Sequence, residues 1–347
     1  MISEYEDLPD EIWQLGVFDA HCHPTDNYSK LESGLGLVKS SKLTIMATRL
    51  DDQDKVHSAA VSFPGRIVPC FGYHPWFTHI FYTSDLLLSK SDHYNAVLIP
   101  AAPSDFIDKL PDPVCWNDVI GALRSNLERH PDALVGEVGL DRSFRLPLSG
   151  QPISYDEESH HDPDQRVLSQ YKVSLDHQTE VLLAQLKLAA EYGRAVSVHG
   201  VQAHGVLYSV LSSLWKDYKP LSRRQRKLGS DLIPISHTFP PRICLHSYSG
   251  PPDQIKLWTD VKKVPAQIYF SFSILINTRY GEKFKSVIRA VPDDRILVET
   301  DFPIADQAMH SLMAGIVRFV CDVKGWDLSR GVTILNQNWH KFVYGMT

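Results

Sequence analysis

Short runs of apolar residues, rich in β-branched side chains, recur along the chain, and most of them end in polar residues. Continuous apolar runs of this length are typical of strands that are buried on both faces, as in parallel sheets. The pattern predicts eight strands, at residues 16–21, 43–48, 67–72, 134–138, 195–199, 243–247, 267–272 and 296–299.

Several segments between these strands have apolar residues three and four positions apart, the spacing of one helix face. The clearest predicted helix covers 175–192 and ends before Gly193, and another covers 309–323. Strands that alternate with helices eight times predict an α/β fold of the TIM (β/α)8 barrel type. The alternative is an open doubly wound sheet, but no G-x-G-x-x-G motif follows a strand to support it.

Two polar stretches interrupt the alternation. Residues 142–172 are rich in Pro, Ser and Asp, and residues 217–241 contain the basic run SRRQRK at 222–227 and then several prolines. Both are expected to be surface insertions. The basic run is either a patch that contacts phosphate or, more commonly, a solvated loop. The length of 347 residues also fits two domains, but we predict a single barrel domain over 1–347 that carries both insertions.

Composition narrows the class of protein. The net charge of −6 gives no general attraction to nucleic acid, so a polyanionic substrate would need metals or a local basic patch. The five cysteines are scattered and odd in number, which favours reduced thiols inside the cell. An acidic N-terminus and the absence of a run of about 18 apolar residues predict a soluble protein of the cytoplasm, the nucleus or both.

Histidines and carboxylates gather where the predicted strands end. His21 and His23 form an H-x-H pair that places both imidazoles on one side of strand one. Four more such residues come at the ends of strands four, five, six and eight: Glu137, His199, His246 and Asp301. The carboxyl ends of barrel strands meet at one rim, where barrel active sites are built.

Each of these six residues alone is more often a structural hydrogen-bonding or turn residue than a metal ligand. Together they would put two carboxylates close to one another, which costs on the order of several kcal/mol unless cations neutralise them. Four imidazoles and two carboxylates form a nitrogen and oxygen ligand set that suits Zn, Mn, Fe or Mg. The sequence therefore predicts a metal site at this rim.

The chain resembles the TatD family of metal-dependent hydrolases, within the amidohydrolase-like barrels. The resemblance rests on the blocks FDAHCHP, FGYHPW, GEVGLD, HQTEVLLAQLKLAAEYGRAVSVHG, LHSYSG and ETDFP and on Asn338-x-x-x-Phe342, and it runs from about residue 17 to residue 342. It implies a deoxyribonuclease or exonuclease that cleaves phosphodiester bonds. It also implies that His21, His23 and Asp301 hold one metal, that His199 and His246 hold the other, and that Glu137 bridges both.

By the same resemblance, His74 lies beside the metals and contacts substrate. The chain departs from the family pattern at Val201, where H-x-R-x-A would place an arginine, and this puts phosphate recognition in doubt. Arg142 and Arg145 are candidates to compensate, as is Arg49 after strand two. The long insertions are similar to those of the eukaryotic, particularly fungal, branch, and they are expected to lie over or beside the barrel mouth and to offer a surface for a protein partner.

We expect two divalent ions, Mg, Mn or Zn, with Glu137 fixing their separation and Asp301 orienting a water molecule and accepting its proton. Nucleic acid or another phosphodiester is the expected substrate. Two alternatives remain open at this point: hydrolysis of small amides or esters on the same scaffold, and a catalytically weak barrel that serves as a protein-interaction partner.

Overall fold

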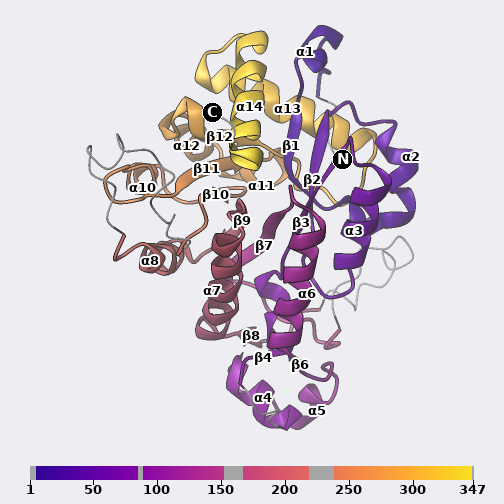
Figure 1. The fold of residues 1–347 in the computed structure, drawn as a ribbon, viewed down its shortest axis with the longest axis vertical. Helices are drawn as coiled ribbons and strands as arrows, with labels where there is room; N and C mark the ends of the chain where they lie inside the picture. The colour runs from indigo at the N-terminus through magenta and orange to yellow at the C-terminus, as the bar shows by residue number, and fades with distance from the viewer. Residues whose placement is uncertain (1–4, 85–88, 152–166, 219–237, 346–347) are drawn as a thin grey trace.

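Eight parallel strands form the centre of the molecule (Figure 1). The computed structural model describes residues 5–84, 89–151, 167–218 and 238–345. In spatial order the strands are β1 Phe18–Cys22, β2 Lys42–Met46, β3 Ile67–Phe71, β7 Leu134–Asp141, β9 Val196–Val201, β10 Arg242–Leu245, β11 Gln267–Phe272 and β12 Ile296–Val298. The neighbours in this order pair in parallel, and all eight correspond to the predicted strands. The predicted TIM-barrel fold is confirmed.

The seam between the last and the first strand is joined at the carboxyl end. Asp301 N donates to His21 O (3.0 Å) and His23 N donates to Phe302 O (3.0 Å). The fully buried Asp19 carboxylate makes further hydrogen bonds at the same seam. It accepts from His21 N, Thr300 N (both 3.1 Å) and Thr300 Oγ1 (2.5 Å). Asp19 therefore links the backbone that carries His21 to the backbone that carries Asp301.

Helices surround the sheet, and some of them begin at a polar side chain that caps the first turn. The predicted 175–192 helix is α7 Leu175–Glu191, whose first turn is capped by Ser174 Oγ accepting from His177 N (3.3 Å). The other described helices are α1 Asp10–Gln14, α2 Leu31–Leu35, α3 Gln53–Ser62, α4 Lys90–Val97, α5 Ser104–Ile107, α6 Trp116–Arg129, α8 His204–Leu214, α10 Asp253–Trp258, α11 Ile274–Asn277, α12 Glu282–Ala290, α13 Gln307–Lys324 and α14 Leu328–Tyr344.

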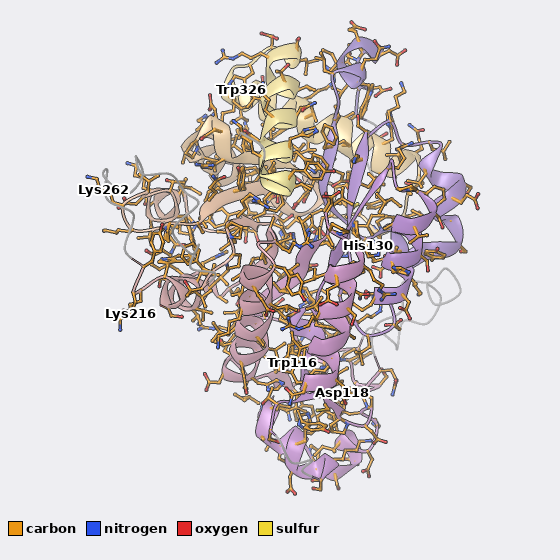
Figure 2. All side chains as sticks on the ribbon, viewed as in Figure 1. Trp116, Asp118, His130, Lys216, Lys262 and Trp326 are labelled. Atoms are coloured by element: carbon orange, nitrogen blue, oxygen red, sulfur yellow. The ribbon has the colours of Figure 1, made fainter. Side chains whose placement is uncertain are left out.

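Two apolar clusters hold the barrel together. The larger lies between the strands and their covering helices, and the smaller packs α14 against one end of the strands through Trp339 and Phe342. Side chains fill the space between the ribbon elements throughout (Figure 2). Within the described ranges, every helix is too short or too polar to cross a lipid bilayer.

A lobe that the sequence pattern did not predict projects from the barrel beside α7 (Figure 1). It contains α4 and α5 and the short strands β4 Phe81–Tyr82, β5 Leu98–Ile99, β6 Val114–Cys115 and β8 Lys172–Val173. β5 pairs antiparallel with β8, and Leu146, Tyr171 and Val173 join the apolar cluster of the lobe. The described ends of the first predicted insertion thus belong to this lobe, beside the carboxyl end of β7.

The second predicted insertion lies elsewhere. The described residues of this insertion lie near the amino ends of the strands. Phe239 packs edge-on against Trp215 and Tyr218. Both of these aromatic residues line a cavity together with Gln267, the first residue of β11. The exposed Lys216 and Lys262 mark this side in Figure 2. The expectation that this insertion lies over the mouth is wrong for its described ends, since it connects a helix to the next strand. The basic run 222–227 lies outside the described residues.

Three buried histidines hold the segment after β3 in place: His79 lies in this segment, His93 lies in α4 of the lobe, and His177 lies in α7. His79 Nδ1 lies 3.1 Å from Trp76 O, His93 Nε2 lies 2.7 Å from His79 O, and His177 Nε2 lies 2.8 Å from Thr78 O. Each ring donates to a backbone carbonyl. Burial lowers the pKa of all three rings, that of His79 to about 4.

The lowered pKa values of these histidines predict that the folded protein loses stability as the pH falls. A histidine whose pKa is lower in the folded state than in the unfolded state stabilises the fold above the unfolded pKa of about 6.5, and the contribution is lost as pH falls toward the folded value. Replacing His79 with Gln, which can still donate to Trp76 O, is expected to reduce the stability loss between pH 7 and pH 5 by about 1–2 kcal/mol.

Denaturant unfolding at the two pH values measures this difference. His340→Gln, in α14 and outside the lobe, is the matched control. An unchanged pH dependence in His79→Gln would mean that the ring does not stay neutral in the folded protein.

Candidate metal centre

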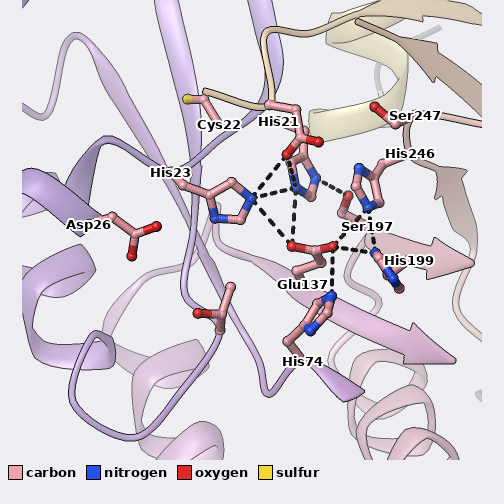
Figure 3. A network of polar contacts seen from close by, with 12 residues as sticks. His21, Cys22, His23, Asp26, His74, Glu137, Ser197, His199, His246 and Ser247 are labelled. Atoms are coloured by element: carbon pink, nitrogen blue, oxygen red, sulfur yellow. Dashed lines mark hydrogen bonds and ion pairs between the residues drawn. The ribbon is translucent and has the colours of Figure 1, made fainter. Parts of the chain in front are cut away.

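The six predicted ligands come from the carboxyl ends of five strands and meet around Glu137. Figure 3 labels five of them: His21, His23, Glu137, His199 and His246. His21 lies in β1, Glu137 in β7 and His199 in β9. The other three follow the ends of their strands: His23 after β1, His246 after β10 and Asp301 after β12. His74, predicted to contact substrate, follows β3 and joins the same group.

One carboxylate lies at the centre of this group. Glu137 Oε1 lies 2.8 Å from His246 Nε2, 3.0 Å from His199 Nδ1 and 3.2 Å from His74 Nε2. Because the Glu137 side chain is almost fully buried, these imidazoles replace water around it. His74 therefore contacts the same oxygen as two of the predicted ligands.

The second oxygen of Glu137 has its own set of neighbours. Oε2 lies 3.3 Å from His23 Nε2 and 3.4 Å from His21 Nε2. Asp301 Oδ1 lies 3.3 Å from His23 Nε2 and 3.7 Å from His21 Nε2. The side chains of His23 and Asp301 are 14% and 15% exposed, so this half of the group faces the barrel mouth.

The electrostatics of the group follow from burial and from opposite charge. Burial alone would raise the pKa of Glu137, but His74, His246 and His21 hold it well below its ordinary value. Burial works against the charged form of His23 as well, yet Asp301 and Glu137 raise its pKa to about 9. Burial has the largest effect on the pKa of His74 and lowers it to about 4. The carboxylates are thus ionised and need positive charge around them.

The donor set fits divalent cations. His21 Nε2 lies 3.1 Å from His23 Nε2, and His199 Nδ1 lies 3.3 Å from His246 Nε2, so lone-pair nitrogens converge in pairs on Glu137. The groups His21–His23–Glu137 and His74–Glu137–His199 each bring three ligand atoms close enough to share one ion. The nearby Cys22 thiol points toward Thr44 O instead (3.5 Å). Nitrogen and oxygen ligands without a thiolate favour Mg, Mn, Fe or Zn.

Three side chains that the sequence interpretation missed contact the rear nitrogens of the rings. Ser197 Oγ lies 2.8 Å from His21 Nδ1, and Asp141 Oδ2 lies 3.1 Å from His199 Nε2. Glu299 Oε1 lies 3.6 Å from His246 Nδ1, and Glu299 is fully buried. Asp141 and Glu299 belong to the GEVGLD and ETDFP blocks, so the signal was present, but spacing alone did not separate them from the predicted ligands.

A glycine allows the strands that carry Glu137 and His199 to approach each other. Gly139 pairs with His199 in the ladder between β7 and β9. Its φ is +155°, and a Cβ there would lie 2.0 Å from the carbonyl oxygen of His199. This close approach helps bring Glu137 beside His199.

The three candidate arginines differ in their surroundings. Arg49 is largely buried and pairs with Asp26 (2.9 Å) and Asp51 (2.9 Å), so its charge is already neutralised. Arg142 and Arg145 are exposed. Arg142 N donates to Val201 O (3.1 Å), which makes Arg142 the neighbour of the position where the family pattern has its arginine.

A closed barrel with histidines and carboxylates at its carboxyl rim defines the class of metal-dependent hydrolases. Comparison with known proteins specifies the family. The family described as TatD related DNase matches residues 18–344. The chain belongs to this family, and it is a TatD-type metal-dependent hydrolase that acts on ester bonds.

Two fungal relatives match over nearly their whole length. The "Cut9-interacting protein scn1" of Schizosaccharomyces pombe is 39% identical over 339 residues, which cover 94% of this chain and 98% of the relative. The "Uncharacterized deoxyribonuclease YMR262W" of Saccharomyces cerevisiae is 26% identical over 342 residues, covering 94% and 99%.

Solved structures share the fold. The TatD homologue YJJV of Escherichia coli K12 has a TM-score of 0.57 at 18% identity, covering 95% of this chain and 98% of its own. A TatD-family hydrolase of Entamoeba histolytica has a TM-score of 0.58 at 13% identity, covering 95% and 99%.

Metal binding by this group is testable through stability. A ligand that binds only the folded state at 100 times its Kd stabilises it by about 2.7 kcal/mol. Titrating the metal-free protein with Mn²⁺ is expected to raise its melting temperature accordingly, and Glu137→Gln is expected to remove most of this gain because both sets of neighbours lose their shared carboxylate. Glu128→Gln, at an exposed position of α6, is the matched control. Equal stabilisation of all three proteins would place the ion elsewhere.

Proposed function

We propose that the chain is a deoxyribonuclease, acting as an exonuclease on phosphodiester bonds with two divalent ions, Mg, Mn or Zn. The observation that carries this proposal is the division of partners around Glu137. Its Oε2 lies among His21 and His23, and its Oε1 lies among His74, His199 and His246. A carboxylate whose two oxygens serve two separate nitrogen groups is suited to bridging two cations.

In this proposal His21, His23 and Asp301 hold one ion, and His199 and His246 hold the other. Such ions would act as Lewis acids that activate water and neutralise charge on the phosphate. Glu137 keeps the two groups of ligands together. Asp301, at the exposed edge of the group, accepts a hydrogen bond from the attacking water and then its proton. His23, His246 and His21 hold the pKa of Asp301 down against the effect of burial, which keeps this carboxylate ionised and able to hold a cation.

Substrate recognition falls to the neighbours of the metal ligands. His74 Nδ1 accepts from Trp76 N (3.2 Å), which leaves the ring proton of the neutral imidazole on Nε2, the nitrogen that faces Glu137 Oε1 (3.2 Å). His74 would therefore contact substrate only through this N–H, beside Glu137. Arg142 and Arg145 supply positive charge that Val201 does not. Lys172 Nζ donates to Arg142 O (3.1 Å), which adds a second cation beside Arg142. Local positive charge of this kind offsets the net charge of −6 for a nucleic-acid substrate.

The names of the two fungal relatives support two parts of this proposal. One is described as a deoxyribonuclease, which favours DNA as the substrate. The other is described as interacting with Cut9, which favours a protein partner bound through the insertions in addition to catalysis. We place the protein in the cytoplasm, the nucleus or both, in keeping with its five unpaired cysteines. We further propose that residues 1–347 form one domain.

Hydrolysis of single-stranded DNA by the Mn²⁺-loaded protein tests the proposal. Glu137→Ala and Asp301→Ala are each expected to lower the rate by at least about 100-fold, because each removes a charge that the reaction needs. Circular dichroism and unfolding curves check that both variants remain folded. Wild-type rates in either variant would contradict the assigned roles.

A small-molecule ester or amide hydrolase is the second candidate, favoured by Val201 at the end of β9. The same preparations assayed on a panel of small esters and amides separate the two functions. Turnover of the panel without cleavage of DNA would replace the nuclease assignment, while the metal centre would stand.

A further inference from the structure

Asp141 is a buried carboxylate at the end of β7, the last residue of the GEVGLD block and four residues after Glu137. It is 4% exposed. Its main chain is fixed from α7, because Gln178 Oε1 accepts from Asp141 N (2.8 Å) and Gln178 Nε2 donates to Asp141 O (3.0 Å). The side chain can therefore be changed while the backbone is held by groups that do not involve it.

The two carboxylate oxygens of Asp141 have different partners. Oδ1 accepts from Ser143 N (2.7 Å), Ser143 Oγ (2.8 Å) and Phe144 N (2.9 Å), which closes the turn after the strand. Oδ2 accepts from Trp76 Nε1 (2.7 Å) and faces His199 Nε2 (3.1 Å). Because the turn amides can only donate, they fix which oxygen faces His199.

His199 differs from the other rings in the nitrogen that it presents. His21, His23, His74 and His246 approach Glu137 through Nε2, whereas His199 approaches through Nδ1 (3.0 Å). A neutral imidazole carries its proton on one nitrogen only, and only the other nitrogen can bind a metal. Nδ1 of His199 is available only when the proton is on Nε2.

We propose that Asp141 is a positioning residue that fixes the tautomer of His199, holding the proton on Nε2 so that Nδ1 is free to bind a cation beside Glu137. A metal-binding histidine commonly donates its other N–H to a carboxylate in this way. Trp76 takes part indirectly, since its indole N–H occupies the same oxygen and keeps the carboxylate plane in place. This inference rests on the proposed metal centre.

A purely structural role for Asp141 has a counterpart in the same molecule. Asp52, after β2, is 1% exposed and accepts from Thr48 N (2.8 Å), Thr48 Oγ1 (2.7 Å) and Arg49 N (3.1 Å). It closes a turn just as Asp141 does, but its described partners include no histidine. Asp52 also lies 3.9 Å from Arg49 Nη1, so it serves as the matched control for a buried, turn-capping carboxylate whose described partners are not imidazoles.

Two substitutions of Asp141 separate its role in capping the turn from its role in fixing the His199 tautomer. Zn²⁺ affinity and melting temperature are expected to rank the two variants in opposite order. In Asp141→Asn the amide oxygen stays with the three turn donors, so the NH2 group takes the place of Oδ2. Trp76 Nε1 loses its acceptor there, as it also does in Asp141→Ala. That NH2 group donates to His199 Nε2 and moves the ring proton to Nδ1, which blocks metal binding. In Asp141→Ala the turn loses its cap, but neither tautomer of His199 is imposed.

Zn²⁺ titration by calorimetry measures the ranking. Zn²⁺ affinity is expected to fall about 100-fold in Asp141→Asn and about 10-fold in Asp141→Ala. The melting temperature is expected to fall more in Asp141→Ala than in Asp141→Asn. Asp52→Asn is expected to lower the melting temperature while its Zn²⁺ affinity stays at the wild-type value.

Nitrogen NMR of the ¹⁵N-histidine-labelled, Zn²⁺-loaded protein gives a readout independent of affinity. His199, assigned by its loss in a His199→Gln sample, is expected to show a protonated Nε2 and a metal-bound Nδ1 in wild type, and a protonated Nδ1 in Asp141→Asn. Wild-type tautomer and wild-type affinity in Asp141→Asn would overturn the role of Asp141 alone. Failure of the wild-type protein to bind Zn²⁺ would instead overturn the proposed metal centre.

Discussion

The structure depends on one buried carboxylate that is surrounded by five imidazoles. An ionised Glu137 removed from water would be strongly destabilising without compensating charge or hydrogen bonds. The barrel supplies this compensation from β1, β9 and the segments after β1, β3 and β10, with ring nitrogens between 2.8 and 3.4 Å from the Glu137 oxygens. The same ring nitrogens can bind cations when they are deprotonated, so Glu137 contributes both to the stability of the fold and to its chemistry.

Hydrogen bonds elsewhere in the molecule hold the backbone that carries these side chains in position. Asp19 ties the His21 backbone to the Thr300 backbone at the barrel seam. Two glutamines of α7 act from outside the candidate metal centre: Gln185 pairs with the main chain of Tyr73, next to His74, and Gln178 pairs with that of Asp141. Helix α7 therefore positions two loops of the rim at once, and the lobe that packs on this side is continuous with the same loops.

Much of this was predictable from sequence. The eight strands follow from apolar runs, and the convergence of the six candidate ligands follows from His and carboxylate residues at strand ends. β7 continues to Asp141, beyond the predicted 134–138, because Gly139 permits close pairing with His199. The lobe was missed because strands of two residues and helices of four to eight leave little periodicity. Spacing also could not tell which carboxylate faces a metal and which, like Asp141 and Glu299, faces the rear of an imidazole.

Anomalous diffraction from crystals of the protein grown with Mn²⁺ shows whether Glu137 joins two cation sites. We expect two anomalous peaks about 3.5–4 Å apart, one bounded by His21, His23 and Asp301 and the other by His199 and His246, with Glu137 between them. A single peak, or peaks that do not contact Glu137, would contradict this expectation.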